Sequence, residues 1–346
     1  MTIGNFKRGF GALSLFGLVL AIGCGRDATA PVAGRPEFVL LDPGTVAQVS
    51  AGDGHTCALR TDGTVACWGS DGFGQATPPA DVFTQLSAGG AHTCGLKTDG
   101  TAACWGRNDF GQATPPADAF TQVSAGAGHT CALRTDGTVA CWGLNDSSQA
   151  TPPADAFTQV SAGAYHTCAL RTDGTVACWG GNAFGQATPP AGPFTQVSAG
   201  FFHSCGLKTD GSVACWGELP SEGQPTTPAD TFSQVSLSTG GGHACGLKTD
   251  GTVACWLLWG GNLGAATPPA GTFSDVSAGG GHTCGLTTDG SVACWGQDDS
   301  GQATPPTHTF TQVDAGVPTP AGSRPTAPSP AGGAARGRRH GGSSPR

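Results

Sequence analysis

The chain has 346 residues, among them 58 glycines and 25 prolines, so its side chains are on average too small to fill the cores of several ordinary helical domains. Charged residues make up 12%, against a typical value of about 25%. Asp and Glu number 24 and Lys and Arg 16, which gives a net charge of -8. This charge argues against a protein that binds along the phosphate backbone of a nucleic acid.

The N-terminal segment has the features of an export signal. Lys7 and Arg8 precede an apolar run of 13 residues, Phe10 to Ile22, which is too short to span a bilayer but fits the apolar region of a signal peptide. The run ends in Ala-Ile-Gly-Cys24, which resembles a bacterial lipobox, in which the cysteine is acylated and becomes the new N-terminus.

This pattern predicts a signal peptide at residues 1–23, lipidation of Cys24 and a tether at residues 24–37. Plain secretion is the alternative. In either case we expect a bacterial protein that works outside the cytoplasm, as an outer-membrane lipoprotein or a secreted protein, with the membrane contacted only through the lipid anchor.

Residues 38–316 are built from one repeated unit. The phrase Phe-Thr-Gln-Leu-Ser-Ala-Gly at Phe83 has a degenerate copy at Val46 and recurs at Phe120, Phe157, Phe194, Phe232, Phe273 and Phe310, in steps of 37, 37, 37, 37, 38, 41 and 37 residues. Such a period is typical of an array in which each unit buries its apolar face only against its neighbours. Seven units are complete.

Each unit contains a predicted hairpin, for example at residues 57–67. Two apolar runs flank Thr-Asp-Gly63, where glycine can take the left-handed conformation of a three-residue loop. With that loop Cys57 faces Cys67 at a pair of positions without backbone hydrogen bonds, where side chains come closest. The alternating segment before the hairpin supplies a third strand, and Pro-Pro after it marks the crossing to the next unit.

The pattern S-A-G-x-x-H-T-C-x-L-x-T-D-G-x-V-x-C-W-G-x-N-x-x-G-Q runs from Val46 to Gly316 and resembles the repeat of the regulator of chromosome condensation family. The resemblance implies an all-β fold, a seven-bladed β-propeller with short three- to four-stranded blades. The unit is similar to the compact blades of bacterial secreted members, one of which inhibits a β-lactamase. The paired cysteines and Ala-Thr-Pro-Pro depart from the eukaryotic members, which argues against chromatin binding or nucleotide exchange.

Fourteen of the 15 cysteines form seven pairs with a spacing of ten residues. In an exported protein these predict seven disulfides: Cys57–Cys67, Cys94–Cys104, Cys131–Cys141, Cys168–Cys178, Cys205–Cys215, Cys245–Cys255 and Cys284–Cys294. The alternative is zinc, because His55, Cys57 and Cys67 could share one face of the hairpin. We expect no metal and no cofactor, and the absence of C-x-x-C weakens redox catalysis.

A histidine precedes the first cysteine of every pair by two positions, and a tryptophan follows the second. Seven histidines could surround an ion, but we expect buried imidazoles bonded to the backbone of their blades. The tryptophans are expected to pack between blades rather than to form a carbohydrate platform.

Function is expected where the repeat varies. A catalytic centre is an asymmetric arrangement that occurs once, whereas Ser, His and Asp recur here in identical contexts, so we expect no enzyme. The unit varies just before the histidine and just after Trp-Gly, and loops carried by a rigid scaffold commonly recognise partners. The candidate binding residues in these two windows are Phe73, Phe110, Tyr165, Phe184, Phe201, Phe202, Trp259, Asp71, Asp109 and Asp298.

Between Cys24 and Gly316 there are nine basic residues and 24 acidic ones, which favours a basic partner surface over nucleic acid. The sequence therefore predicts a monomeric, non-catalytic binding scaffold of the cell envelope that holds an unknown protein partner on one propeller face. The alternatives are a secreted inhibitor of an enzyme such as a β-lactamase, and a lyase or hydrolase, which would need a unique charged cluster at one rim.

Residues 317–346 do not continue the repeat and are rich in Pro, Ala and Arg. Suitable codons for Val317 to Gly333, read in the neighbouring frame, give Gly-Ala-His-Thr-Cys-Gly-Leu-Lys-Thr-Asp-Gly-Thr-Val-Ala-Cys-Trp-Gly, which is the repeat. We interpret this tail as the frame-shifted remnant of an eighth unit, which the nucleotide sequence can test; a natural disordered tail is the alternative. Because eight leading strands serve seven hairpins, one terminal copy, at Val46 or Phe310, is expected to close the ring by pairing with the other end.

Overall fold

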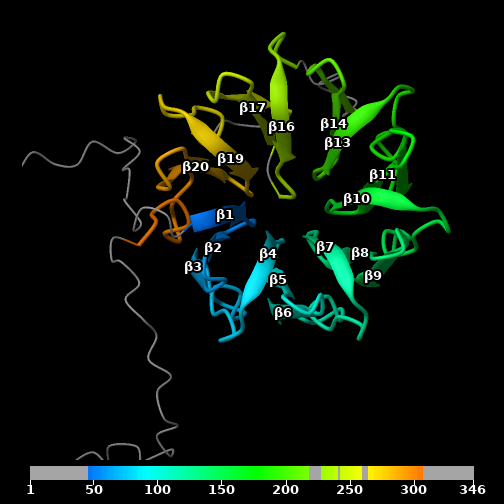
Figure 1. Ribbon diagram of the computed structural model, residues 1–346, viewed down its shortest axis with the longest axis horizontal. Helices are drawn as coiled ribbons and strands as arrows, with labels where there is room; N and C mark the ends of the chain where they lie inside the picture. The colour runs from blue at the N-terminus through cyan, green and yellow to red at the C-terminus, as the bar shows by residue number, and fades with distance from the viewer. Residues whose placement is uncertain (1–45, 218–226, 241, 259–263, 307–346) are drawn as a thin grey trace, which may run out of the picture.

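The computed structural model describes residues 46–217, 227–240, 242–258 and 264–306. They form seven three-stranded antiparallel sheets arranged around an axis as the blades of a propeller (Figure 1). Blade 1 comprises β1 to β3 and blade 7 comprises β19 to β21, and these two blades lie side by side. The predicted all-β, seven-bladed propeller is confirmed, with three strands in each blade.

The strands of each blade follow one another in chain order from the axis outward. The innermost strands are β1 (Val46–Ala51), β4 (Phe83–Ala88), β7 (Phe120–Ala125), β10 (Phe157–Ala162), β13 (Phe194–Ala199), β16 (Phe232–Leu237) and β19 (Phe273–Ala278). The middle strands are β2 (His55–Arg60), β5 (His92–Lys97), β8 (His129–Arg134), β11 (His166–Arg171), β14 (Ser204–Lys208), β17 (His243–Lys248) and β20 (His282–Thr287). The outer strands are β3 (Val65–Gly69), β6 (Ala102–Gly106), β9 (Val139–Gly143), β12 (Val176–Gly180), β15 (Val213–Trp216), β18 (Val253–Leu257) and β21 (Val292–Gly296). Among the residues described, no helix is both long and apolar enough to cross a bilayer.

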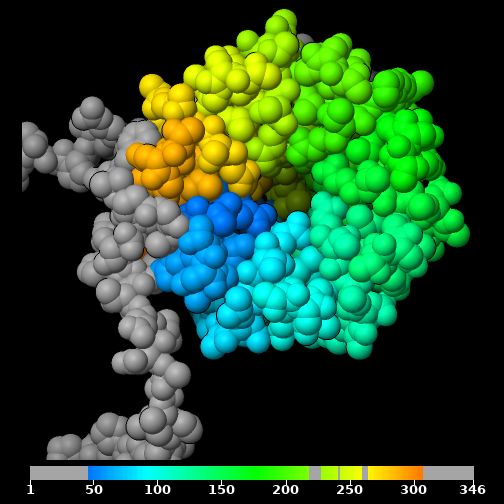
Figure 2. All heavy atoms as spheres, viewed as in Figure 1, coloured from blue at the N-terminus to red at the C-terminus, as the bar shows by residue number. Residues whose placement is uncertain are grey.

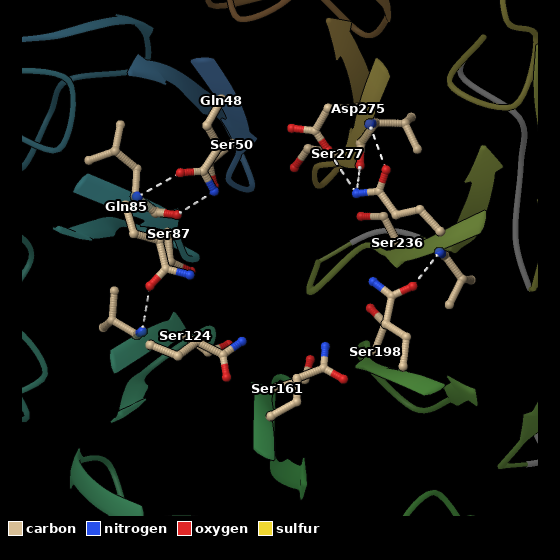
Figure 3. Close-up of a pocket in the computed structure, with 18 of the residues that line it drawn as sticks. Gln48, Ser50, Gln85, Ser87, Ser124, Ser161, Ser198, Ser236, Asp275 and Ser277 are labelled. Atoms are coloured by element: carbon tan, nitrogen blue, oxygen red, sulfur yellow. Dashed lines mark hydrogen bonds between the residues drawn. The ribbon is translucent and has the colours of Figure 1, made fainter. Parts of the chain in front are cut away.

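A hollow of about 200 Å³ lies on the propeller axis (Figure 2). Two rings of polar side chains from the innermost strands line it (Figure 3). One ring consists of Gln48, Gln85, Gln122, Gln159, Gln196, Gln234 and Asp275, and the other of Ser50, Ser87, Ser124, Ser161, Ser198, Ser236 and Ser277.

These two rings tie neighbouring blades together. Gln48 Oε1 accepts the N–H of Leu86 at 2.8 Å, and Ser50 Oγ accepts the N–H of Ala88 at 2.9 Å. The serine bond is present between all seven pairs of neighbouring blades. The accepted N–H groups lie on the free edge of each innermost strand, so the polar lining satisfies an edge that would otherwise be unpaired.

The hairpins have the predicted register. Leu59 pairs with Val65 and Cys57 with Cys67, and Gly63 has a φ of 84° in the three-residue loop. Asp62 fixes this loop, because its Oδ1 accepts the hydroxyl of Thr64 at 2.7 Å and the N–H of Thr64 at 2.9 Å. These two bonds lower the pKa of the Asp62 carboxyl.

Every hairpin carries the disulfide that its cysteine spacing predicts. The Cα atoms of each pair are 4.0–4.1 Å apart, as suits the closely spaced positions of an antiparallel pair. Seven disulfides indicate that the ring folds in an oxidising environment. Because the cysteines are bonded to one another, they are not available to zinc.

The apolar core is divided among the interfaces between blades. Cys57 and Leu59 of blade 1 form one buried cluster with Phe83, Leu86 and Trp105 of blade 2. Comparable clusters lie between the other neighbouring blades, including blades 7 and 1. The expected packing of the tryptophans between blades is confirmed.

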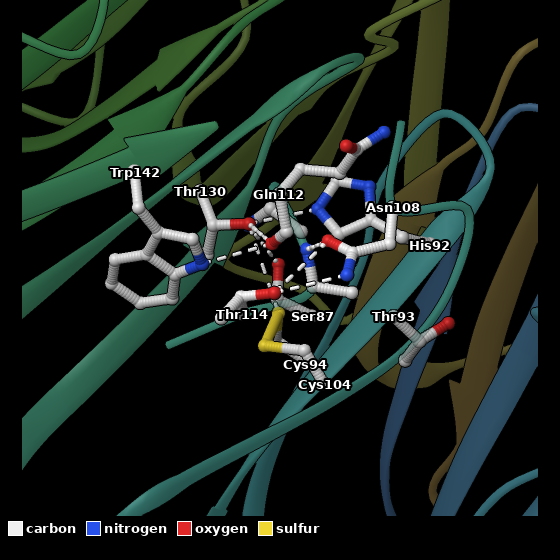
Figure 4. The surroundings of a disulfide bond; sticks show 12 residues. Ser87, His92, Thr93, Cys94, Cys104, Asn108, Gln112, Thr114, Thr130 and Trp142 are labelled. Carbon is white, nitrogen blue, oxygen red and sulfur yellow. Dashed lines mark hydrogen bonds between the residues drawn. A yellow bond between two sulfur atoms is a disulfide. The ribbon is translucent and has the colours of Figure 1, made fainter. Parts of the chain in front are cut away.

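A second set of bonds between blades surrounds the disulfide Cys94–Cys104 (Figure 4). His92 Nε2 bonds to the hydroxyl of Thr130 in the next blade at 2.8 Å. That hydroxyl donates to the Gln112 carbonyl at 2.9 Å, which also accepts the indole N–H of Trp142 at 2.9 Å. The buried imidazoles were expected to bond to the backbone, and this is wrong: six of the seven bond through Nε2 to a hydroxyl of the next blade.

The ring closes through the same contacts. His282 Nε2 of blade 7 bonds to the Thr56 hydroxyl of blade 1 at 2.7 Å, and Thr56 and Trp68 both donate to the Gln302 carbonyl at 3.0 Å. The terminal strand β1 pairs with β2 of its own blade rather than with the other end of the chain. Phe310, the other expected closing strand, lies outside the described residues, as do the predicted signal, tether and tail.

Candidate binding surface

Where the structure describes both variable windows of a blade, the two windows meet on one face of the ring. In blade 1 the N–H of Ser70, after β3, donates to the carbonyl of Gly54, in the turn between β1 and β2, at 2.8 Å. Gly181 and Tyr165 make the same bond in blade 4, also at 2.8 Å. We call this the turn face. The Thr-Asp-Gly loops join β2 to β3 at the other end of the blade, on what we call the hairpin face.

Four of the predicted aromatic residues form one cluster on the turn face, across blades 4 and 5. The ring centroids of Phe201 and Phe202 are 4.3 Å apart, and Phe202 lies 4.8 Å from Phe184. Tyr165 packs edge-on against Phe201 at 5.4 Å and has 41% of its surface exposed. The structure therefore brings together side chains that the sequence places up to 37 residues apart.

Phe73 and Phe110 form a second group with Arg107, whose guanidinium carbon lies 5.3 Å and 5.4 Å from the two ring centroids. Asp109 forms an ion pair with this guanidinium, with Oδ2 2.6 Å from Arg107 Nε. Phe73 and Phe110 are 55% and 46% exposed. We call these two groups together the aromatic arc; the first lies on blades 4 and 5 and the second on blades 1 and 2.

The predicted acidic residues form hydrogen bonds or ion pairs within their own loops. Asp71 accepts the N–H of Ala76 at 2.8 Å and the hydroxyl of Thr77 at 2.7 Å. Asp298 accepts the N–H of Ala303 in the same way, and Asp109 pairs with Arg107. Asn108, Asn145 and Asn182 occupy the same loop position as Asp71 and make the same backbone bond, so the carboxylate is not required for it. Trp259, the remaining aromatic candidate, lies outside the described residues.

Asp53 is a turn-face residue that the sequence analysis did not select. Its Oδ1 accepts the hydroxyl of Thr239 in blade 6 at 3.0 Å, and Gly240 packs so closely on this carboxyl that a β-carbon would have no room. Burial raises the pKa of Asp53, and the bond from Thr239 offsets part of that rise. Asp53 is the only acid at its position in the seven units, a signal that the sequence did contain.

One contact between blades is incomplete. Ala244 stands where the other units have the hydroxyl that bonds to the histidine of the preceding blade. Both ring nitrogens of His203 are buried without a hydrogen-bond partner among the described residues. The indole N–H of Trp256 also has no partner there. We call this contact the 5/6 junction, and it lies next to the aromatic cluster of blades 4 and 5.

The described residues carry 18 acidic and 7 basic side chains, so the ring is strongly acidic. Within that part of the chain no three His, Cys, Asp or Glu side chains gather as metal ligands. The available chemistry is therefore that of exposed aromatic rings and hydrogen-bonding loops on an acidic, rigid ring.

Fold and surface define a seven-bladed β-propeller whose variable loops are gathered on one face. The chain belongs to the regulator of chromosome condensation (RCC1) repeat family, which it matches over residues 46–75, 83–112, 120–149, 157–186, 194–224 and 273–302. Propellers of this family are mostly binding or exchange-factor proteins rather than enzymes. The unit that begins at Phe232, blade 6, is not among the matched segments.

Solved structures with the same fold include plant ectodomains. The ectodomain of the receptor kinase CR4 from Physcomitrella patens is 28% identical, with a TM-score of 0.63, and the match covers 73% of this chain and 74% of that one. The ectodomain of the Arabidopsis thaliana receptor kinase ACR4 is 29% identical, with a TM-score of 0.61 and coverage of 73% and 96%. Prp20p from Saccharomyces cerevisiae shares the fold at 17% identity, with a TM-score of 0.56 and coverage of 72% and 82%. No protein with a curated description matches the chain.

Proposed function

We propose that this protein is a non-catalytic scaffold of the cell envelope that binds a protein partner on the turn face. The aromatic arc carries the proposal: Phe73, Phe110 and Tyr165 are exposed on one face of a ring whose other positions mostly repeat. Clusters of aromatic and arginine side chains rimmed by polar groups are typical of the centres of protein interfaces.

The charge of the ring indicates the kind of partner. With 18 acidic and 7 basic residues in the described part, it favours association with a basic surface. The solved relatives support a binding role, since CR4 and ACR4 are ectodomains of receptor kinases and Prp20p was studied for its binding to Gsp1p and histones.

Export and anchoring are part of the same proposal. The seven disulfides agree with export through the signal at residues 1–23, followed by lipidation of Cys24 and a tether at residues 24–37. Replacing Cys24 by serine should release the protein from the membrane fraction and abolish incorporation of labelled fatty acid. Unchanged fractionation and labelling would refute the anchor.

The binding test compares two variants of the ring. Tyr165→Ser, Phe201→Ser and Phe202→Ser together should reduce capture of a crosslinked envelope protein at least about tenfold, because aromatic anchors dominate such interfaces. Val82→Ser is the matched control, since Val82 is also an exposed apolar residue (50%) but packs beside Gly63 on the hairpin face. Equal capture by both variants, with unchanged melting temperatures, would contradict the proposal.

A further inference from the structure

The axial hollow contains one break in its sevenfold symmetry. In the polar ring that contains Gln48, six of the seven positions are glutamine, and the seventh is Asp275 (Figure 3). Asp275 Oδ1 accepts the Nε2–H of Gln234 at 2.7 Å, so the carboxylate is held in place at the wall of the hollow. A carboxylate cannot donate as a glutamine amide does, and the substitution leaves a negative charge in an otherwise neutral ring.

No cation compensates this charge from within the hollow. The described residues that line it are Gln, Ser, Val and Leu besides Asp275, without Lys, Arg or His. Burial raises the pKa of the Asp275 carboxyl, and the bond from Gln234 together with backbone hydrogen bonds from Val49 and Val276 offsets part of that rise. A positively charged ligand beside it would therefore be favoured.

The neighbouring oxygens are suited to a ligand that donates several hydrogen bonds. Ser277 Oγ and Ser236 Oγ each accept one backbone N–H, from Ala51 at 2.9 Å and Ala278 at 3.0 Å, and retain a second lone pair. A primary ammonium has three donors and no acceptor, which matches one carboxylate and several hydroxyl or amide oxygens. Calcium prefers six to eight oxygen ligands with several carboxylates, which one acid does not provide.

We propose that the axial hollow binds a primary ammonium group, with Asp275 as its counter-ion and the Gln and Ser oxygens as its acceptors. Two sources share this chemistry, a free alkylamine and a lysine side chain of a peptide inserted along the axis. The site lies on the axis, apart from the aromatic arc, and does not depend on the proposed partner.

The test measures binding of n-butylammonium to the folded, oxidised ring by calorimetry, with 1-butanol as the neutral probe of the same shape. A second arm uses an acetyl-Gly-Lys-Gly-amide peptide and the same peptide with an acetylated lysine. Both arms are measured in moderate salt. Salt weakens binding to exposed acids, whereas a buried charge such as that of Asp275 is screened less. The ammonium probes should bind and their neutral counterparts should not. Binding of butylammonium alone would identify a free amine as the source. Binding of the peptide alone would identify a lysine side chain as the source.

Asp275→Gln is the decisive variant, because it gives the seventh position the residue present at the other six and should preserve the fold. It should weaken ammonium binding at least about tenfold. Asp146→Asn removes one exposed charge from the turn face and should leave the affinity unchanged. The proposal would be overturned if Asp275→Gln and the wild type bound the ammonium equally well. It would also be overturned if 1-butanol bound as well as butylammonium, or if no ammonium binding were detected in the millimolar range. A normal melting temperature of Asp275→Gln excludes unfolding as the cause of lost binding.

Discussion

The contact between blades 2 and 3 and the 5/6 junction are built from the same sequence pattern, yet only the first has the bond between histidine and hydroxyl. At the first, His92, Thr130 and Trp142 all find hydrogen-bond partners. At the 5/6 junction, Ala244 supplies no hydroxyl, and His203 is buried without a hydrogen-bond partner among the described residues. The difference teaches that the disulfides and apolar clusters suffice to hold two blades together, while the bonds between histidine and hydroxyl add stability that one junction lacks.

Acidification should weaken all the junctions that have a bond between histidine and hydroxyl at once. The resulting loss of stability is the largest effect that we expect. Burial lowers the pKa of His92, His129, His166 and His282 to about 3 and of His55 and His243 to about 4, from 6.5. Below pH 6.5 the unfolded chain therefore takes up protons that the folded ring does not, so stability falls by up to about 1.4 kcal/mol per pH unit for each of these histidines.

Thermal unfolding measured from pH 8 to pH 4 tests this expectation. The melting temperature should be level above pH 7 and fall steeply from about pH 6.5 downward. A level melting temperature down to pH 5 would show that the imidazoles are accessible to protons in the folded ring.

Removal of one disulfide should cost less, and the cost should not depend on the junction. Cys131→Ala with Cys141→Ala in blade 3 and Cys205→Ala with Cys215→Ala in blade 5 each open a loop with a sequence separation of 10. Loop-closure entropy predicts a loss of about 2.5 to 3 kcal/mol in both cases, because the bridge acts mainly on the unfolded chain. Urea unfolding of the two double variants checks this, and a much larger loss in one blade would contradict it.

The smallest effects come from exchanging the two kinds of junction. Thr130→Ala should cost about 1 to 3 kcal/mol, because it leaves the buried His92 Nε2 unsatisfied. Ala244→Thr should stabilise the ring by about 1 kcal/mol, because it offers His203 the missing hydroxyl. Denaturant midpoints measure both changes, and a destabilising Ala244→Thr would mean that the 5/6 junction has no room for the hydroxyl.

The hairpins could be predicted in detail because their determinants are local. The Thr-Asp-Gly63 loop sets the register, and this register places Cys57 opposite Cys67 without any information from other blades. The aromatic arc was predicted from the same kind of information, as the set of residues at which one unit differs from the next. Its packing into two groups depends on neighbouring blades and could not be derived from one unit.

The partners of the repeated polar residues were missed because they lie one unit away. His55 bonds to Thr93, 38 residues further along the chain, so no reading of a single unit contains both. The Gln and Ser rings were likewise overlooked, although Gln48 and Ser50 have equivalents in every leading strand and Asp275 is the single exception among the glutamines. Ala244 is a comparable signal, since it is the one alanine where the other units have a hydroxyl.

The contacts that close the ring have a consequence for how the gene can be rearranged. Thr56 joins the last blade to the first through the same kind of bonds that join blades 2 and 3, so the closing contact resembles an internal one. A gene that joins the ends of residues 46–306 by a short linker and opens the chain in another Pro-Pro crossing, such as Pro115–Pro116, should still produce the folded ring. Such permuted chains would allow a fusion partner to be attached at a chosen blade.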